Sequence, residues 1–354
     1  MERRVKMGLV GGGFGCAFQF GVHPGCKVVA VADLRPDRRE ALRNYYRCDT
    51  VYHTLEELLR DPNMEAVGLF TPAPLHARHS IAALKAGKHV LSAVPAAFTL
   101  EECQQLLDTV RATGLTYMMA ETSYYRKETI QARKWYQEGR FGELFYCEGE
   151  YWHEALDSLM FHNGERTWRY GYPPMHYPTH STAFLIGVTG ERLIHVQCIG
   201  WGDDNEILKT NVYNNPFWNE VAFFQTDRGY ATRMAVGWHL GHPEIERASW
   251  FGSDFSFFMA SPTGQPNAVS QSVHVQNVDV PDFYELLPGS LRHGSGHGGS
   301  HTHLTHEFIC ALLEERRPAI DIYEAIAYTA PGIVAHQSAL KGGESLPVPD
   351  FGRA

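Results

Sequence analysis

The first 33 residues constrain the fold of this chain more than any other segment. An apolar run at residues 5–10 leads into the cluster Gly11-Gly12-Gly13-Phe14-Gly15, and a second apolar run at residues 28–32 ends at Asp33. This order predicts a strand, a tight glycine turn that opens a helix, and a second parallel strand. Glycines let the backbone approach a pyrophosphate, a helix N-terminus offers N–H donors, and an acid 20 residues after Gly13 accepts from a ribose hydroxyl. The segment therefore predicts a dinucleotide-binding domain.

Residues around the second strand favour NAD over NADP as the cofactor. The charge of Asp33 would repel a 2′-phosphate. Arg35, Arg38 and Arg39 follow closely and weaken that preference, and we count Arg38 among the cofactor contacts. Cys16 stands where the third glycine of the motif is expected, and it is small enough for close packing of helix on strand.

Composition narrows the function classes. The chain has 354 residues, 44% of them hydrophobic and 20% charged, which is enough for two domains with real cores. A net charge of −9 without a basic tract argues against nucleic acid or an anionic membrane as partner. The seven cysteines show no zinc spacing or C-x-x-C pair, and the N-terminus lacks a signal-peptide layout. We therefore expect a cytoplasmic protein with reduced thiols and no metal site.

Two textures follow one another along the chain. Up to about residue 120, strand-like and helical patterns alternate, which predicts a doubly wound parallel sheet. Beyond Glu121, runs rich in Tyr and Trp predict a large open, mainly antiparallel sheet, as in an α+β domain. We place the domains at 1–121 and 122–354, with a C-terminal helix packing back on the first. The later predicted elements are strands at 144–152, 193–199, 220–226 and 230–236, helices at 127–138, 303–315 and 323–340, and a Gly/His-rich loop at 289–303.

The segment at residues 70–108, FTPAPLHARHSIAALKAGKHVLSAVPAAFTLEECQQLLD, resembles the glucose–fructose oxidoreductase and inositol dehydrogenase family, Gfo/Idh/MocA. The similarity extends to RFGEL at 140–144 and to the C-terminal PDF. It implies an N-terminal Rossmann domain and a sugar or polyol site at the carboxyl ends of the parallel strands. It also implies a homo-oligomer, a dimer or tetramer, paired through the open sheet. The cofactor contacts it implies in this segment are Thr71, Pro72, Leu75, His76, Val94 and Pro95, with His76 shaping the loop.

Two positions depart from the dehydrogenases of that family. Their Glu-Lys-Pro reads Ala93-Val94-Pro95 here, so the lysine that polarises the reacting hydroxyl is a valine. Their Asp-x-x-x-His reads His176 to His180, so His180 keeps the position that takes the hydroxyl proton.

A second resemblance is to the NAD-dependent glycoside hydrolases of the same superfamily, typified by α-N-acetylgalactosaminidases. These enzymes share the VPAA sequence, a Glu like Glu121, a strand like CEGEY at 147–151, a Tyr-x-x-His like Tyr177 to His180, and a GHGG loop like residues 296–299. After GHGG they have Met-Asp-Tyr, whereas this chain has Ser300-His301-Thr302.

The resemblance implies a reaction that oxidises carbon 3 of the sugar transiently. His180 would take the proton of the carbon 3 hydroxyl, and either Tyr151 or Tyr177 would remove the proton at carbon 2. A tyrosine has an ordinary pKa near 10, so it needs a cation or hydrogen bond, which His176 or Arg126 would supply. Glu121 would face the nicotinamide or the sugar.

Several further residues are predicted to line the substrate site. Trp168 and Tyr172 would stack on a sugar ring and Arg169 would pair with an anionic group, or this loop packs on the sheet edge instead. The histidines between 293 and 306 invite a metal interpretation, but the interspersed glycines disfavour a helix there. We interpret that segment as a glycine-hinged loop closing over the sugar. The remaining predicted substrate contacts are His153, His176 and His301.

Three functions remain open from sequence. The leading one is an NAD-dependent glycoside hydrolase acting on a glycoside or sugar that carries an anionic group or none. The second is an NAD-dependent sugar or polyol dehydrogenase or sugar 3-oxidase, which Val94 disfavours. The third is a non-catalytic sugar- or NAD-binding regulator, which the retention of His180 disfavours.

Overall fold

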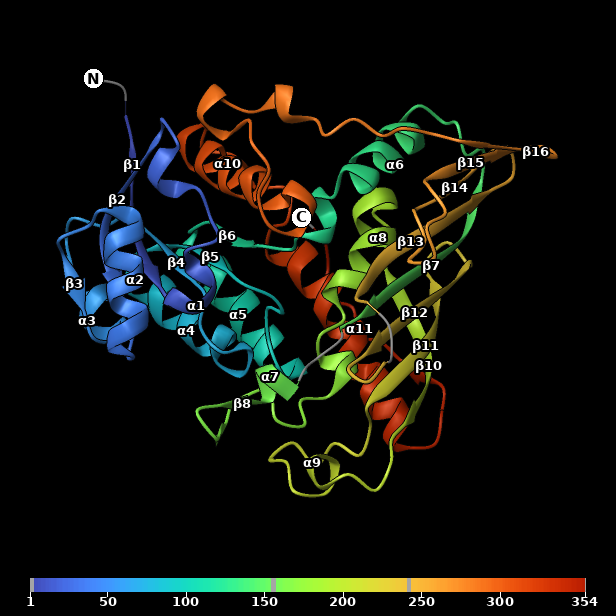
Figure 1. Ribbon diagram of the computed structural model, residues 1–354, viewed down its shortest axis with the longest axis horizontal. Coiled ribbons are helices and arrows are strands. Elements are labelled where there is room, and N and C mark those ends of the chain that lie inside the picture. Colours follow the sequence, from blue (N-terminus) through green and yellow to red (C-terminus); the bar gives the residue numbers. More distant parts are fainter. Residues whose placement is uncertain (1–2, 154–156, 241–242, 354) are drawn as a thin grey trace. The chain divides into compact units, whose positions relative to one another are not determined.

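The computed structural model describes residues 3–153, 157–240 and 243–353 (Figure 1). The chain divides into two compact units, and each is described by itself. The first comprises Met1–Arg126, Asp282–Ile326 and Arg353–Ala354, and the second comprises Lys127–Pro281 and Ala327–Gly352. The chain thus returns to the first unit after the large sheet. The sequence placed the boundary after residue 121, with a C-terminal helix packing back on the first domain.

The first unit is built on a parallel sheet of six strands in the order β3-β2-β1-β4-β5-β6. This is the doubly wound order, in which ligands bind where the order reverses, beyond the carboxyl ends of β1 and β4. The strands are β1 (Val5–Val10), β2 (Cys26–Ala32), β3 (Val51–Tyr52), β4 (Ala66–Leu69), β5 (His89–Ser92) and β6 (Tyr117–Met119).

Helices of the first unit begin at the caps that the sequence signals. Thr99 and Glu102 form a complete capping box at the start of α5 (Leu100–Thr113). At α3 (Leu55–Leu59), Thr54 accepts the Glu57 N–H, but the Glu57 carboxylate accepts the N–H of His53 rather than that of Thr54. The other helices are α1 (Gly12–Gly15), α2 (Pro36–Tyr46), α4 (His76–Lys85) and α10 (Ser300–Leu313).

The helix that the glycine turn opens, α1, is a single turn, and beyond it the Gln19 N–H donates to Thr305 Oγ1 at 3.3 Å. One expectation about this unit was wrong in extent. The Gly/His-rich loop ends sooner than expected, because α10 begins at Ser300 after Gly299 in the left-handed conformation (φ 92°). The glycines that disfavour a helix all precede residue 300, so His301 lies on a helix.

The second unit is built on a sheet of nine strands in the order β16-β15-β14-β13-β7-β12-β11-β10-β17. Every adjacent pair is antiparallel except β7 and β12, which are parallel. The strands are β7 (Leu144–Trp152), β10 (Leu193–Trp201), β11 (Asn219–Thr226), β12 (Ala231–Gly237), β13 (Ile245–Gly252), β14 (Ser256–Phe258), β15 (Ala268–Gln271), β16 (His274–Asn277) and β17 (Leu346–Pro347).

One helix, α8 (Thr179–Thr189), packs on the inner face of this sheet against β7, β12 and β13 (Figure 1). Its residues from Thr179 to Val188 are all buried, as expected of a helix enclosed in a core. Trp250 of β13 donates from Nε1 to the Phe184 carbonyl at 2.8 Å, which ties helix to sheet. The remaining elements are α6 (Lys127–Gln137), α7 (Asp157–Met160), β8 (Phe161–His162), β9 (Glu165–Arg166), α9 (Glu206–Lys209) and α11 (Ile322–Leu340).

Two further observations concern membrane-spanning helices and the cysteines. Within the residues the structure describes, none of the helices is both long and apolar enough to cross a bilayer. All seven cysteines are free thiols, as expected.

The half-buried imidazole of His79 predicts acid sensitivity. Burial, with Arg78 beside it, lowers the pKa of His79 from 6.5 to about 4, so the unfolded chain binds more protons between these values. Stability should therefore rise with pH across that window. We expect the free energy of unfolding to be about 1 kcal/mol lower at pH 5 than at pH 7 because of His79, after allowing for partial solvent screening.

Urea unfolding at the two pH values checks this contribution. His79→Gln should flatten the dependence, whereas the same change at exposed His53 should leave it as it is. Equal slopes for the wild type and His79→Gln would contradict the assignment.

Candidate functional site

The glycine turn after β1 accepts no larger residue. Gly11 has a φ of +98°, and a Cβ built there lies 2.2 Å from the Phe70 carbonyl oxygen. A Cβ on Gly12 lies 2.2 Å from the Arg38 carbonyl oxygen. Glycine is therefore required for conformation at the first position and for close approach of α2 at the second.

Asp33 closes over this turn as the motif predicts. Its Oδ2 accepts the Gly12 N–H at 2.7 Å, and its Oδ1 accepts the Arg35 N–H at 2.8 Å. Arg39 donates to the Asp33 carbonyl at 2.7 Å, and the Arg38 guanidinium lies beside Gly13, 3.2 Å from a Cβ built there. The structure thus brings together the predicted contacts Gly11, Gly13, Asp33 and Arg38, with Phe14 and Gly15 in α1.

His76 joins the two loops that follow β4 and β5. Its Nε2 lies 2.7 Å from the Thr71 carbonyl oxygen and its Nδ1 lies 2.8 Å from the Pro95 carbonyl oxygen. The ring is 1% exposed. His76 thereby holds the loop with Thr71 and Pro72 to the loop with Val94 and Pro95. Leu75 ends the short 3-10 turn that leads into α4.

Glu121 and His301 both lie in the first unit. Glu121 is completely buried just beyond β6, and its Oε1 accepts the Ser123 N–H at 2.7 Å. His301 lies in the first turn of α10, stacked on Phe18 (ring centroids 4.7 Å apart) and edge-on to Phe14 (5.3 Å). His301 therefore packs against aromatic side chains of the glycine segment rather than riding on a mobile loop, which corrects the expectation.

The predicted proton-transfer residues of the second unit form one buried cluster. Tyr151 points inward from β7, because it shares the buried face with Cys147 and Gly149, while His180 is the second residue of α8. The ring centroids of Tyr151 and His180 lie 4.5 Å apart, those of Tyr177 and His180 5.4 Å, and those of the two tyrosines 6.0 Å. The structure thus brings both candidate tyrosines to the same imidazole.

The loop with Trp168 and Arg169 flanks this cluster. The Arg169 guanidinium lies 4.3 Å from the Trp168 ring and 5.5 Å from the Tyr177 ring. Tyr172 is buried, and its carbonyl accepts the indole N–H of Trp238 at 2.8 Å. The His153 ring lies 5.9 Å from that of Tyr151.

The charges around the cluster indicate which side chain could lower the pKa of a tyrosine in it. Burial raises the pKa of Tyr151 well above 10; Tyr177 and two glutamates add to this, and Arg169 opposes it. Burial lowers the pKa of His176 well below 6.5, with His336 adding to the effect, so His176 is neutral and cannot supply the charge as expected. Arg169 is the guanidinium that supplies it within this unit.

Sequence reasoning missed a buried carboxylate that binds the turn preceding Tyr177. Glu220 of β11 is completely buried; its Oε1 lies 2.8 Å from His336 Nδ1, and its Oε2 accepts the Met175 N–H at 2.7 Å. The pair therefore anchors the 3-10 turn Pro174–His176 that leads to Tyr177. The sequence did contain a signal for this residue. Glu220 is in step with Ala222 and Phe224 in the alternation along the strand, so it lies on the same buried face of β11.

We predict that Asp33 selects the cofactor. Its carboxylate is fixed over the glycine turn, where it would meet a 2′-phosphate. Titration calorimetry on cofactor-stripped protein should show NAD⁺ bound more tightly than NADP⁺, by about tenfold or more for one repulsive contact. Asp33→Ser should narrow that difference, and tighter binding of NADP⁺ by the wild type would overturn the assignment.

Comparison with known families gives two matches on one chain. Residues 5–121 match an oxidoreductase family model, GFO_IDH_MocA, described as an NAD-binding Rossmann fold. Residues 272–354 match the C-terminal domain of glycosyl hydrolase 109. The glycine turn and Asp33 lie within the residues that match this NAD-binding fold.

Similar proteins cover most of the chain. A glycosyl hydrolase family 109 protein of Solibacter usitatus is 26% identical over 85% of this chain and 74% of its own length. Another, of Streptomyces filamentosus, is 27% identical over 99% of this chain and 78% of its own length. Among solved structures, levoglucosan dehydrogenase in complex with NADH and levoglucosan shares the fold, with a TM-score of 0.81 at 20% identity over 98% of this chain and 100% of its own.

Proposed function

Because the chain belongs to the Gfo/Idh/MocA family and carries the C-terminal domain of glycoside hydrolase family 109, we propose that it hydrolyses a glycoside with NAD as a retained cofactor. The observation that carries the proposal is the buried cluster of His180, Tyr151 and Tyr177. A simple dehydrogenation needs one base, whereas elimination next to a ketone needs two. The cluster supplies an imidazole and a phenol in contact.

The proposed reaction has no net redox change. NAD⁺, when bound, accepts the hydride from carbon 3 and returns it at the end. His180 takes the proton of the carbon 3 hydroxyl as that carbon becomes a ketone, which makes the hydrogen at carbon 2 acidic. A tyrosine of the cluster removes that proton and the bond from carbon 1 to the aglycone breaks. Water adds its hydroxide at carbon 1 and its proton goes to the departed aglycone oxygen. The tyrosine returns a proton to carbon 2, and His180 returns its proton to the carbon 3 oxygen as the ketone is reduced.

Tyr151 is the tyrosine we assign to carbon 2. Its ring is nearer to that of His180 than the Tyr177 ring is, and it projects from a central strand rather than from a turn. The buried phenol is protonated in the free protein, so it needs a positive charge to act as a base. Arg169 supplies that charge across the cluster, and Glu121 is assigned to the cofactor or sugar.

The neighbouring dehydrogenase structures favour a second candidate, an NAD-dependent sugar dehydrogenase. Val94 argues against it, because valine can neither donate a hydrogen bond nor titrate where dehydrogenases of the family have lysine. A transient oxidation tolerates slower hydride transfer, since the ketone is never released.

A panel of aryl glycosides tests the proposal. The panel includes neutral sugars, uronic acids and sulfonated sugars, because Arg169 matches an anionic group. Protein as purified should release the phenol without added cofactor, and protein stripped of NAD should do so only after NAD⁺ is restored. Release of NADH in proportion to sugar, with no phenol, would replace the proposal by the dehydrogenase.

A further inference from the structure

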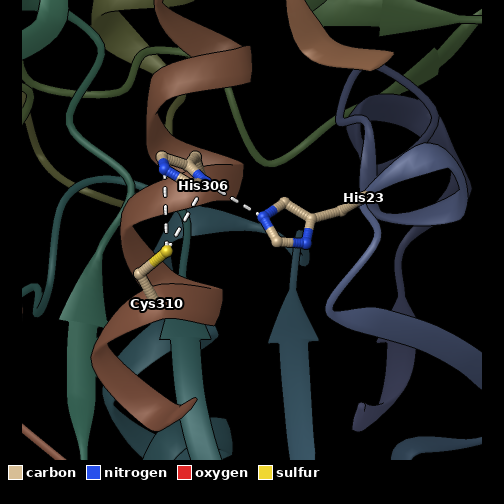
Figure 2. Close-up of side chains that lie close together, drawn as sticks. All are labelled: His23, His306 and Cys310. Carbon is tan, nitrogen blue, oxygen red and sulfur yellow. Dashed lines mark hydrogen bonds between the residues drawn. The ribbon is translucent and has the colours of Figure 1, made fainter. Parts of the chain in front are cut away.

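Three side chains with metal-binding atoms meet in the first unit, apart from the predicted cofactor contacts (Figure 2). His306 and Cys310 are four residues apart on α10, so they lie on the same face of the helix. His23 reaches them from the segment that precedes β2. We propose that His23, His306 and Cys310 bind a thiophilic divalent cation of the zinc type.

The distances suit three corners of a tetrahedral site. His23 Nε2 lies 3.0 Å from His306 Nδ1, and Cys310 Sγ lies 3.5 Å from His306 Nδ1. One ligand atom from each residue falls within 4.8 Å of the others. Bonds of about 2.0–2.1 Å to nitrogen and about 2.3 Å to sulfur place tetrahedral ligand atoms about 3.3–3.6 Å apart, so closure needs movements of about 1 Å or less.

The backbone around the cluster is already fixed. The Val5 N–H donates to the Gly25 carbonyl at 2.8 Å, which attaches the turn after His23 to β1. Gly25 itself abuts α10, since a Cβ there lies 2.7 Å from Leu313 and 3.3 Å from Ile309. The two elements that carry the ligands are therefore in contact before any cation binds, which lowers the entropic cost of binding.

The protonation states of the three side chains determine how many protons are released when a cation binds. Burial and His306 lower the pKa of His23 to about 4, and burial lowers that of His306, so both imidazoles are neutral and able to ligate. Burial raises the pKa of Cys310, so its thiol gives up one proton to solvent when the sulfur–metal bond forms.

One hydrogen bond opposes binding. The Gly25 N–H donates to His23 Nδ1 at 3.0 Å, so in the free protein Nε2 carries the proton that points to His306. Ligation through Nε2 moves that proton to Nδ1, and the Gly25 contact opens. We therefore expect weaker binding than at a site whose outer partner accepts a hydrogen bond. A solvent water completes the coordination, since His306 and Cys310 are only half-buried.

The site would fasten the segment after the glycine turn to α10, the helix whose first turn packs on Phe14 and Phe18. Spacings among the histidines from 293 to 306 cannot reveal this set, because His23 lies 283 residues from His306 in the sequence.

Cobalt(II) titration of the metal-stripped full-length protein tests the proposal. We expect one Co²⁺ per chain, with a thiolate-to-cobalt charge-transfer band and the visible bands of tetrahedral cobalt, both lost on adding Zn²⁺. Cys310→Ser should remove the charge-transfer band, and His23→Asn should weaken binding at least tenfold. Cys16→Ser is the matched control, because this thiol is also half-buried in the first unit, and it should keep the band.

Calorimetry of Zn²⁺ binding in two buffers should show about one proton released per ion near neutral pH. Absence of the charge-transfer band in wild-type protein, or an equal band in Cys310→Ser, would overturn the proposal. If His23→Asn does not fold by circular dichroism, the comparison of Cys310→Ser with Cys16→Ser still decides.

Discussion

Replacing His180 with alanine should lower kcat/KM by about 10²- to 10⁴-fold, the usual cost of losing one general base. The imidazole is the nitrogen base of the buried cluster, and the neighbouring phenol of Tyr151 is assigned to the proton at carbon 2 instead. Cofactor affinity should not change, because the glycine turn and Asp33 belong to the other unit. Steady-state kinetics and NAD⁺ titration measure the two quantities on one preparation.

His195→Ala provides the matched control, because His195 lies exposed on β10 in the same unit. It should keep wild-type rates. If His180→Ala retained more than about a tenth of wild-type activity, His180 would not be the base.

Tyr151→Phe should produce a loss of similar size, about 10²- to 10⁴-fold, because it removes the phenol and keeps the ring that packs on His180. Tyr146→Phe is the control on the same strand, since Tyr146 lies on the opposite face of β7. Tyr177→Phe should cost less if Tyr151 is the carbon 2 base. The reverse order of effects would exchange the two roles.

The tyrosine assignment also predicts a pH dependence. Because the pKa of Tyr151 lies above 10, only a small fraction is phenolate near neutrality, so kcat/KM should rise with pH. Arg169 opposes that rise in pKa, so Arg169→Gln should move the ascending limb to higher pH. A limb that stays in place in Arg169→Gln would remove Arg169 from this role.

Local patterns in the sequence were sufficient to predict much of the fold. The bounds of β7 were predicted at 144–152, because a run rich in Tyr and Trp stands there. The start of α5 was predictable because Thr99 and Glu102 form a capping box, which is a local sequence signal. Long-range contacts and backbone conformation decided the rest: Gln19 bonds Thr305 from the far part of the chain, and α10 starts directly after Gly299, which is in the left-handed conformation.

The candidate site divides in the same way. His180, Tyr151 and Tyr177 were predicted because a motif names each of them, and the structure adds that they touch. Glu220 and His336 carry no motif, and they lie 116 residues apart in the sequence, on β11 and α11. The choice of Arg169 over His176 as the cation depends on burial, which decides which side chain keeps its charge.

The most direct test of the transient oxidation is turnover of a cleaved aryl glycoside in deuterium oxide, followed by NMR of the released sugar. In the proposed mechanism, the phenol of Tyr151 holds the carbon 2 proton while the aglycone leaves and water enters, so this proton exchanges with solvent before carbon 2 is reprotonated. Direct displacement at carbon 1 leaves the carbon 2 hydrogen in place. We expect deuterium at carbon 2 of the sugar, with no accumulation of NADH. A sugar released with protium at carbon 2, or a free keto-sugar formed with equimolar NADH, would contradict the proposed mechanism.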